Sequence, residues 1–291
     1  MALITPLVTP SWLADHLHDP DLLVFDASYY LPTEGKDAEA EFAKAHIPGA
    51  ARFDVDAIKD AVDPLPHMVP TPARFAALVG ALGIHNGARI VVYDQKGIFS
   101  APRAWWLMRL FGHDQAFVLD GGLPLWLAEG RPTESGPAKP RPKAEFHPSY
   151  RPRLLRGLGD MADNLASKAE LVLDARSAAR FHAEAPEPRA GLRAGHIPGA
   201  RSLPARENID AAGRFLPVDE LRSKLAAVGV DGTARVVSSC GSGVTACHTL
   251  LVMEHAGVGH GRLYPGSWSQ WSSDPERPIE TGEDVASHRV G

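Results

Sequence analysis

The stretch "RVVSSCGSGVTACHTLLVMEHAG", Arg235 to Gly257, contains the pattern that decides the fold. Its first residues, "RVVSS", predict a short buried β-strand. From Ala246 onward, the apolar residues have the spacing of an α-helix. The loop "CGSGVT" joins the two segments. A strand, a tight loop and a helix in this order are typical of a parallel sheet covered by crossover helices.

Cys240 opens this loop, directly after the predicted strand. In open α/β sheets, ligands bind beyond the carboxyl ends of the strands, so Cys240 stands where a site is expected. Gly241 and Gly243 allow the backbone to turn its N–H groups inward, which creates a concavity for an anion in front of the helix. Such a setting lowers a cysteine pKa below its usual value of about 8.5 and favours a reactive thiolate over an inert buried thiol. Cys247, inside the helix, is expected in the core.

The chain also contains an internal duplication. The run "HIPGA" at 46–50 returns 150 positions later at 196–200, and its histidines are expected to be structural. Three further pairs keep the same order: "LLVFDAS" (22–28) with "LVLDARS" (171–177), "RIVVYD" (89–94) with "RVVSSC" (235–240), and "LDGGLPLW" (119–126) with "YPGSWSQW" (264–271). The sequence therefore predicts two copies of one unit.

Each copy alternates short apolar runs with helix-like segments, so the expected fold is α/β, with two tandem domains that each have a mostly parallel sheet flanked by helices. The segment 131–152 holds six prolines and mixed charges, which favour an exposed linker. We therefore expect a first domain at 1–131, a proline-rich linker at 132–152 and a second domain at 153–291.

Composition narrows the class of protein. The chain has 291 residues, 44% of them hydrophobic, and a net charge of −5 that is spread along the sequence. No apolar run is long enough for a membrane span, and no basic cluster suggests nucleic acid. Two cysteines with six residues between them fit neither a disulfide framework nor a zinc knuckle. The amino terminus lacks a secretion signal, so a soluble, cytoplasmic protein that acts on small molecules or proteins is expected.

These residues resemble a known family. From about Leu3 to Pro278, the chain is similar to tandem-domain rhodanese-type sulfurtransferases, and "CGSGVTA" resembles their 3-mercaptopyruvate sulfurtransferase branch. Both "HIPGA" runs, "YDQKGIFSAPRAWW" (93–106) and "YPGSWSQW" carry the resemblance, whereas Gln270 replaces the family's more usual glutamate. Aligning the copies puts Asp94 opposite Cys240, so the first domain resembles the family's inactive amino-terminal domain.

The resemblance implies that the Cys240 thiolate takes a sulfur atom from a donor as a persulfide and passes it to an acceptor, with no metal or organic cofactor. The acceptor would be a thiol, such as reduced thioredoxin, or cyanide. Thiosulfate-specific members carry cationic residues after the cysteine, but here Gly241 and Ser242 follow. A hydrogen bond to a charged group contributes roughly 1.5–3 kcal/mol, so the loss of two such partners favours 3-mercaptopyruvate over thiosulfate as the donor.

The resemblance also suggests site residues. Arg180 and Arg189 match the family's substrate-binding arginines, and a guanidinium suits the carboxylate of the donor. Ser242, His67 and Asp56 match a set proposed to assist proton transfer, and functional and structural roles for them stay open here. Backbone groups of the loop complete the expected site: Gly241, Gly243, Val244 and Thr245. Arg103 is expected to be structural.

Two other classes of function are compatible with parts of this pattern. Cysteine-based phosphatases and arsenate reductases place a cysteine in a similar loop, but they need an arginine six positions on, where this chain has Ala246. A thiosulfate:cyanide sulfurtransferase and a non-catalytic rhodanese-like binding module remain as alternatives, and Cys240 argues against the second. The sequence leaves open the physiological acceptor, the oligomeric state, the metabolic purpose and the extent of thiosulfate activity.

Overall fold

The computed structural model describes residues 5–282 and shows two compact units. Unit 1 comprises 1–64, 68–152 and 209–215, and unit 2 comprises 65–67, 153–208 and 216–291. Each unit therefore includes one short segment from the other half of the sequence. Among residues 5–282, no helix has the length and apolar character needed to cross a bilayer.

Unit 1 is built on a five-stranded sheet in which every pairing is parallel. The strand order is β1 (Leu7–Val8), β5 (Ala116–Leu119), β4 (Arg89–Tyr93), β2 (Leu22–Asp26) and β3 (Ala51–Arg52). Its helices are α1 (Pro10–His16), η1 (Pro32–Glu34), α2 (Ala38–Lys44), α3 (Pro72–Ala81), α4 (Ala101–Leu110) and α5 (Gly122–Ala128).

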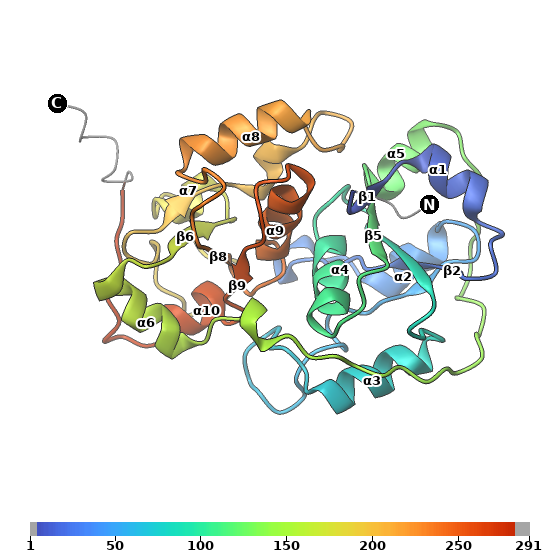
Figure 1. Ribbon diagram of the computed structural model, residues 1–291, viewed down its shortest axis with the longest axis horizontal. Helices are drawn as coiled ribbons and strands as arrows, with labels where there is room; N and C mark the ends of the chain where they lie inside the picture. The colour runs from blue at the N-terminus through green and yellow to red at the C-terminus, as the bar shows by residue number, and fades with distance from the viewer. Residues whose placement is uncertain (1–4, 283–291) are drawn as a thin grey trace. The chain divides into compact units, whose positions relative to one another are not determined.

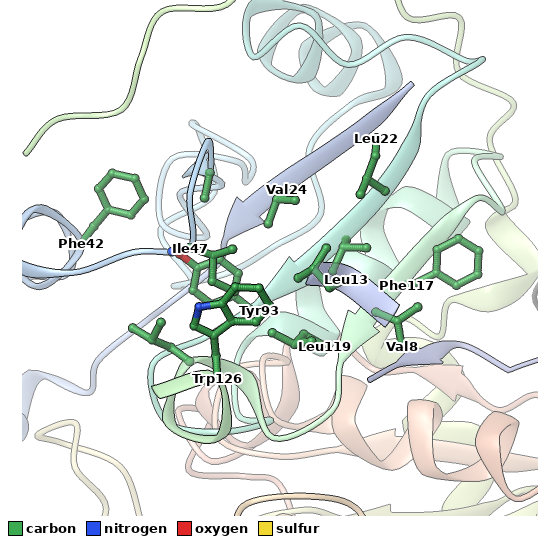
Figure 2. Close-up of a cluster of buried hydrophobic side chains, with 13 residues drawn as sticks. Val8, Leu13, Leu22, Val24, Phe42, Ile47, Tyr93, Phe117, Leu119 and Trp126 are labelled. Carbon is green, nitrogen blue, oxygen red and sulfur yellow. The ribbon is translucent and has the colours of Figure 1, made fainter. Parts of the chain in front are cut away.

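A cluster of buried side chains from the sheet and its helices forms much of the core of unit 1. Figure 2 shows Ile47, Tyr93 and Trp126 close together in this cluster, with Leu13, Phe117 and Leu119 further along it. The Tyr93 hydroxyl accepts the N–H of Ile47 at 3.2 Å, so the one polar atom of this ring is satisfied. Burial of this apolar surface, at about 25 cal/mol per Å², holds the helices on the sheet.

Unit 2 repeats the design with a four-stranded parallel sheet. The strand order is β7 (Arg201–Ser202), β6 (Leu171–Asp174), β8 (Val236–Ser239) and β9 (Arg262–Leu263). Its helices are α6 (Leu158–Ser167), α7 (Ala178–Phe181), η3 (Ala205–Asn208), α8 (Val218–Ala227), α9 (Ala246–His255) and α10 (Ser267–Trp271), and η2 (Pro152–Leu154) precedes α6. In Figure 1, α9 runs beside β9 and α8, which it also contacts.

The register of the strands confirms the two tandem α/β units. Asp26 pairs with Tyr93 in unit 1, and Asp174 pairs with Ser239 in unit 2. Asp94 and Cys240 are therefore the first residues after equivalent strands, as the sequence alignment of the two copies predicts.

The histidines of the two "HIPGA" runs are buried and make matching contacts. His46 Nδ1 donates to Phe42 O at 2.9 Å, and its ring stacks on Phe42 with a centroid distance of 3.9 Å. His196 Nδ1 donates to Phe181 O at 2.9 Å and stacks on Phe181 at 3.7 Å. Both side chains therefore act as structural hydrogen-bond donors inside their own unit.

The proline-rich segment 132–152 follows the surface of unit 1. The N–H of Ala144 donates to Gly80 O at 2.9 Å, and the N–H of Ser149 donates to Phe111 O at 2.8 Å. Phe146 is buried at 4% exposure. Backbone hydrogen bonds and one buried aromatic side chain therefore attach this segment to unit 1. The predicted domain boundaries at 131 and 153 stay a prediction.

Candidate active site

Cys240 lies between β8 and α9 and is 1% exposed. Its Sγ accepts the N–H of Gly243 at 3.1 Å. Gly243 has a φ of +78°, and a Cβ at this position would lie 2.7 Å from Pro265 O. Only glycine meets both conditions without strain, so Gly243 shapes the loop around the sulfur.

Four other N–H groups of the loop are available to a ligand. Among residues 5–282, the backbone N–H groups of Gly241, Ser242, Val244 and Thr245 have no hydrogen-bond partner. The first three of these residues are buried and Thr245 is half-buried. Unpaired buried N–H groups are rare because they are costly. Their concentration beside one sulfur atom, ahead of α9, gives a site that can stabilise an anion.

The start of α10 holds the other side of the same loop. The N–H of Trp268 donates to Cys240 O at 2.9 Å, and the N–H of Ser269 donates to Gly241 O at 2.9 Å. Ser269 Oγ donates to Gly241 O as well, at 2.7 Å. Because the carbonyl oxygens of Cys240 and Gly241 accept hydrogen bonds from α10, the loop presents N–H groups rather than carbonyl oxygens to the sulfur.

Ser267 adds a second contact from the same segment. Its hydroxyl accepts the N–H of Cys240 at 3.1 Å and donates to Tyr264 O at 2.8 Å. Ser267 is buried and has a φ of +50°, in the left-handed region that few residues other than glycine adopt. The equivalent residue of unit 1 is Gly122, with a φ of +54°. The unit that carries the cysteine thus has a strained serine where its counterpart has glycine.

Asp94 occupies the position of Cys240 in unit 1, and its own loop surrounds it. The carboxylate, which is fully buried, accepts four backbone N–H groups at 2.7–2.9 Å, from Lys96, Phe99, Ser100 and Ala101. The donors of this loop are therefore occupied by an internal anion. In unit 2, the equivalent N–H groups of Ser242 and Thr245 have no such acceptor among residues 5–282, whereas that of Cys247 donates to Val244 O at 3.1 Å.

The two arginines predicted from the sequence lie beside the loop of unit 2. A Cβ built on Gly241 would lie 3.1 Å from Arg180 Nη2 and 3.8 Å from Arg189 Nη1. The absence of a side chain at Gly241 therefore gives both guanidinium groups room next to Cys240. Two guanidinium groups at this position can bind a carboxylate.

Glu187 holds Arg180 in place. Its carboxylate accepts Arg180 Nε at 3.2 Å and also Arg180 Nη2, and it accepts Arg176 Nη1 at 2.6 Å. Arg176 is fully buried, donates to Asp174 and lies over the Trp268 ring at 4.6 Å. Burial lowers the pKa of Arg176, but Asp174 and Glu187 outweigh it, so the pKa is raised and the guanidinium stays charged.

The structure brings His67 and Ser242 together. His67 Nδ1 lies 2.9 Å from Ser242 Oγ, and both side chains are buried. His67 belongs to unit 2 through its contacts, although it comes from the first half of the sequence. Asp56 lies in unit 1, is exposed, and donates its N–H to Asp54 Oδ1 at 2.8 Å.

Cys247 and Arg103 are buried and contact other parts of their own unit, as expected of structural side chains. Cys247 is fully buried in α9 and donates its thiol to Gly243 O at 3.4 Å. Arg103 is 1% exposed and lies over the Trp106 ring at 5.5 Å. In the described part of the chain, no group of three or more His, Cys, Asp or Glu side chains is placed to hold a metal ion.

Comparison with known proteins gives the family. The family model described as a rhodanese-like domain matches residues 9–129 and 158–274. The chain belongs to the rhodanese family. Each of its two units contains one rhodanese-like domain, and Cys240 lies in the second.

Relatives of this rhodanese cover nearly the whole chain. The 3-mercaptopyruvate sulfurtransferase of Homo sapiens is 40% identical over 95% of this chain and 95% of its own. The thiosulfate sulfurtransferase of Bos taurus is 38% identical over 95% and 96%. A crystal structure of SseA from Escherichia coli, described as a 3-mercaptopyruvate sulfotransferase, superposes with a TM-score of 0.82 at 37% identity, over 91% of this chain and 99% of that one.

Sequence reasoning did not find Ser267, Ser269 or Glu187 of this rhodanese. The comparison of its two copies held a signal for Ser267, because "GG" in the first copy becomes "GS" in the second at a position that needs a positive φ. Glu187 stands between two prolines in "APEPRAG", a context typical of an exposed loop. Only the fold shows that it is buried between two arginines.

Proposed function

We propose that this protein is a 3-mercaptopyruvate sulfurtransferase in which Cys240 carries the transferred sulfur. One observation carries the proposal: a buried cysteine faces open backbone N–H groups, and two arginines lie beside it. The N–H groups suit an anionic sulfur, and the arginines suit the carboxylate of the donor. Family membership and high-coverage relatives with this activity support the assignment.

The first half-reaction moves sulfur from the donor to the enzyme. The Cys240 thiolate attacks the sulfur of 3-mercaptopyruvate, an S–S bond forms and the bond between sulfur and carbon 3 breaks. The electron pair of the broken bond stays with pyruvate as its enolate, and carbon 3 then takes up a proton. That proton replaces the one lost from the donor thiol, so the products are pyruvate and a Cys240 persulfide.

The second half-reaction returns the enzyme to its starting state. An acceptor thiolate attacks the outer sulfur of the persulfide, the S–S bond to Cys240 breaks, and the Cys240 thiolate leaves. The acceptor departs as a persulfide; with cyanide the product is thiocyanate. The N–H groups of the loop stabilise the sulfur anion in both steps, as an oxyanion hole stabilises oxygen.

We propose that His67 and Ser242 assist the proton transfer. Their contact of 2.9 Å gives a relay between a hydroxyl and an imidazole beside the loop. We propose Asp56 as the third member of this set on the basis of the family resemblance. Its role is testable because Asp56→Asn should lower the rate of pyruvate release without changing the stability of the fold.

Overall identity does not decide the donor, because the human 3-mercaptopyruvate enzyme and the bovine thiosulfate enzyme are 40% and 38% identical to this chain. The loop does favour one donor. Gly241 and Ser242 are uncharged, so the residues that follow Cys240 add no cation for a dianion such as thiosulfate. Thiosulfate remains as a weak alternative donor.

We further propose a thiol acceptor such as reduced thioredoxin, or cyanide, and a cytoplasmic location, where Cys240 and Cys247 would stay reduced. No part of the mechanism calls for a cofactor, nucleic acid or a membrane.

The proposal is tested by comparing kcat/KM for 3-mercaptopyruvate and for thiosulfate, with cyanide as the acceptor in both assays. We expect a clear preference for 3-mercaptopyruvate. A preference for thiosulfate would reverse the choice of donor.

A further inference from the structure

We propose that Ser269 is a positioning residue for sulfur transfer at Cys240. It holds the peptide group between Gly241 and Ser242 in the orientation that presents the Ser242 N–H to the anionic sulfur. The inference rests on the proposed function and concerns the same loop. Ser269 acts through the backbone of the loop, so it is not a catalytic residue.

The first observation is a pair of hydrogen bonds to one carbonyl oxygen. Gly241 O accepts the N–H of Ser269 at 2.9 Å and the hydroxyl of Ser269 at 2.7 Å. Ser269 is only 4% exposed, so both hydrogen bonds are shielded from water. Two hydrogen bonds from one residue of α10 therefore fix the direction of the Gly241 carbonyl.

The planarity of the peptide bond carries this constraint to the next residue. In a trans peptide, the C=O of one residue and the N–H of the next point in opposite directions. No cis peptide bond occurs in the described part of the chain. Since the Gly241 carbonyl points to α10, the Ser242 N–H points away from α10. This N–H has no partner among residues 5–282, so it is kept available for an anion.

The equivalent N–H of unit 1 shows what this orientation serves. Lys96 aligns with Ser242, and its N–H donates to Asp94 Oδ1 at 2.9 Å. In unit 1, the internal carboxylate itself therefore orients the N–H. In unit 2 that carboxylate is absent, and negative charge develops on sulfur during the transfer. An N–H that must be in place before this charge develops needs another restraint, as in a preorganised oxyanion hole.

One contact between the loop and the following helix is common to both units. In unit 1, the N–H of Leu123, in α5, donates to Asp94 O at 3.0 Å. In unit 2, the N–H of Trp268, in α10, donates to Cys240 O at 2.9 Å. The two copies therefore share the same attachment up to this residue.

The next residue of each helix makes the difference. Pro124 is the third residue of α5, and Ser269 is the third residue of α10. Proline has neither a backbone N–H nor a hydroxyl. Pro124 therefore cannot supply the contact that Ser269 makes with Gly241 O. This second attachment is found in the unit that carries the cysteine.

Ser272 provides a matched control at the end of the same helix. It is 2% exposed, and its hydroxyl donates to Trp268 O at 2.7 Å. Ser269→Ala and Ser272→Ala thus each remove one buried hydroxyl that donates to a carbonyl oxygen. Of these two hydroxyls, the one of Ser269 binds the loop that holds Cys240.

Ser269→Pro gives unit 2 the residue of unit 1 and removes both hydrogen bonds to Gly241 O. The Ser269 N–H donates to the loop rather than within α10. Proline is tolerated in the first turn of a helix, where the N–H has no intrahelical partner. We therefore expect α10 to persist in this variant.

The test measures pyruvate release in a single turnover, with 3-mercaptopyruvate and no acceptor, and checks folding by circular dichroism and thermal unfolding. We expect the rate constant at saturating donor to fall about 30-fold in Ser269→Pro and about threefold in Ser269→Ala. The half-saturating donor concentration should change less than about twofold, because the N–H stabilises charge that develops in the transition state. Ser272→Ala should match the wild-type chain in both quantities.

A second readout reports on the Ser242 N–H itself. In proton–nitrogen correlation NMR spectra, its amide proton should move downfield when Cys240 is loaded with sulfur, because the N–H then binds an anion. We expect this shift in the wild-type chain and in Ser272→Ala, a smaller shift in Ser269→Ala, and none in Ser269→Pro.

Equal rates in the wild-type chain and in Ser269→Pro would overturn the inference, and so would a Ser242 shift of the same size in both. The same slowing in Ser272→Ala would also overturn it. If Ser269→Pro does not fold, Ser269→Ala decides through the same comparison with Ser272→Ala. A wild-type chain that releases no pyruvate would instead refute the proposed function, so the two failures are distinguishable.

Discussion

The hydroxyl of Ser267 accepts the N–H of Cys240 at 3.1 Å from a backbone position with a φ of +50°. This contact fixes the backbone of Cys240 through a neighbour 27 positions away, and it does so at the cost of local strain. Its counterpart in unit 1, Gly122, has the same backbone conformation without a hydroxyl, beside a loop without a cysteine. Of these two equivalent positions, only the one beside the cysteine carries a non-glycine residue at a positive φ.

Replacing Ser267 separates strain from hydrogen bonding. Ser267→Ala keeps the strained φ and loses the hydroxyl, whereas Ser267→Gly loses the hydroxyl and relieves the strain. We expect Ser267→Ala to lower the free energy of unfolding by about 1 kcal/mol more than Ser267→Gly. Both variants should slow alkylation of Cys240 by iodoacetamide, because its N–H loses its acceptor. Urea unfolding and alkylation rates test this, and wild-type alkylation in both variants would contradict it.

Gly243→Ala and Gly241→Ala should act differently although they lie two residues apart. A Cβ at Gly243 would lie 2.7 Å from the backbone oxygen of Pro265, and the residue has a positive φ that alanine disfavours. We therefore expect Gly243→Ala to lower the free energy of unfolding by about 2 kcal/mol and to abolish activity.

A Cβ at Gly241 meets only the ends of two side chains, Arg180 Nη2 at 3.1 Å and Arg189 Nη1 at 3.8 Å. This variant should keep its stability and show a higher KM for 3-mercaptopyruvate. Equal loss of stability in both variants, measured by thermal unfolding, would count against the assigned geometry.

Asp94→Asn tests the internal anion of unit 1. An amide can accept fewer of the four N–H groups that now bind the carboxylate, so we expect the free energy of unfolding to fall by about 2–3 kcal/mol. Asp210→Asn, at an exposed turn, serves as the control and should cost less. Urea unfolding monitored by tryptophan fluorescence provides the measurement. Equal unfolding free energies for the two variants would show that the buried Asp94 carboxylate stabilises the fold no more than the carboxylate of Asp210 does.

The sequence predicted the framework of the site because its signals are local. A strand, two glycines and a helix between 235 and 257 place Cys240 at the end of β8, and the two copies align Asp94 with it. Ser267 and Glu187 act through contacts across the fold, and nothing near them in the sequence specifies those partners. The same holds for His67, whose three-residue segment belongs to unit 2 by its contacts.

The segment 132–152 shows a different limit of local reasoning. Its prolines correctly indicate the absence of helix and strand over most of its length. They do not reveal that Phe146 is buried. Nor do they reveal that Ala144 packs so closely on Gly80 that a Cβ at position 80 would lie 2.5 Å from the carbonyl oxygen of Ala144. Composition predicted the secondary structure of this segment, whereas its packing depends on unit 1.

The most direct test of the central claim is the mass of the protein after incubation with 3-mercaptopyruvate in the absence of an acceptor. We expect the wild-type chain to gain the mass of one sulfur atom, located on Cys240 by peptide mapping, with one equivalent of pyruvate released. Cys247→Ser should behave in the same way, and Cys240→Ser should gain nothing and release no pyruvate. Sulfur located on Cys247, or pyruvate release by Cys240→Ser, would contradict the account.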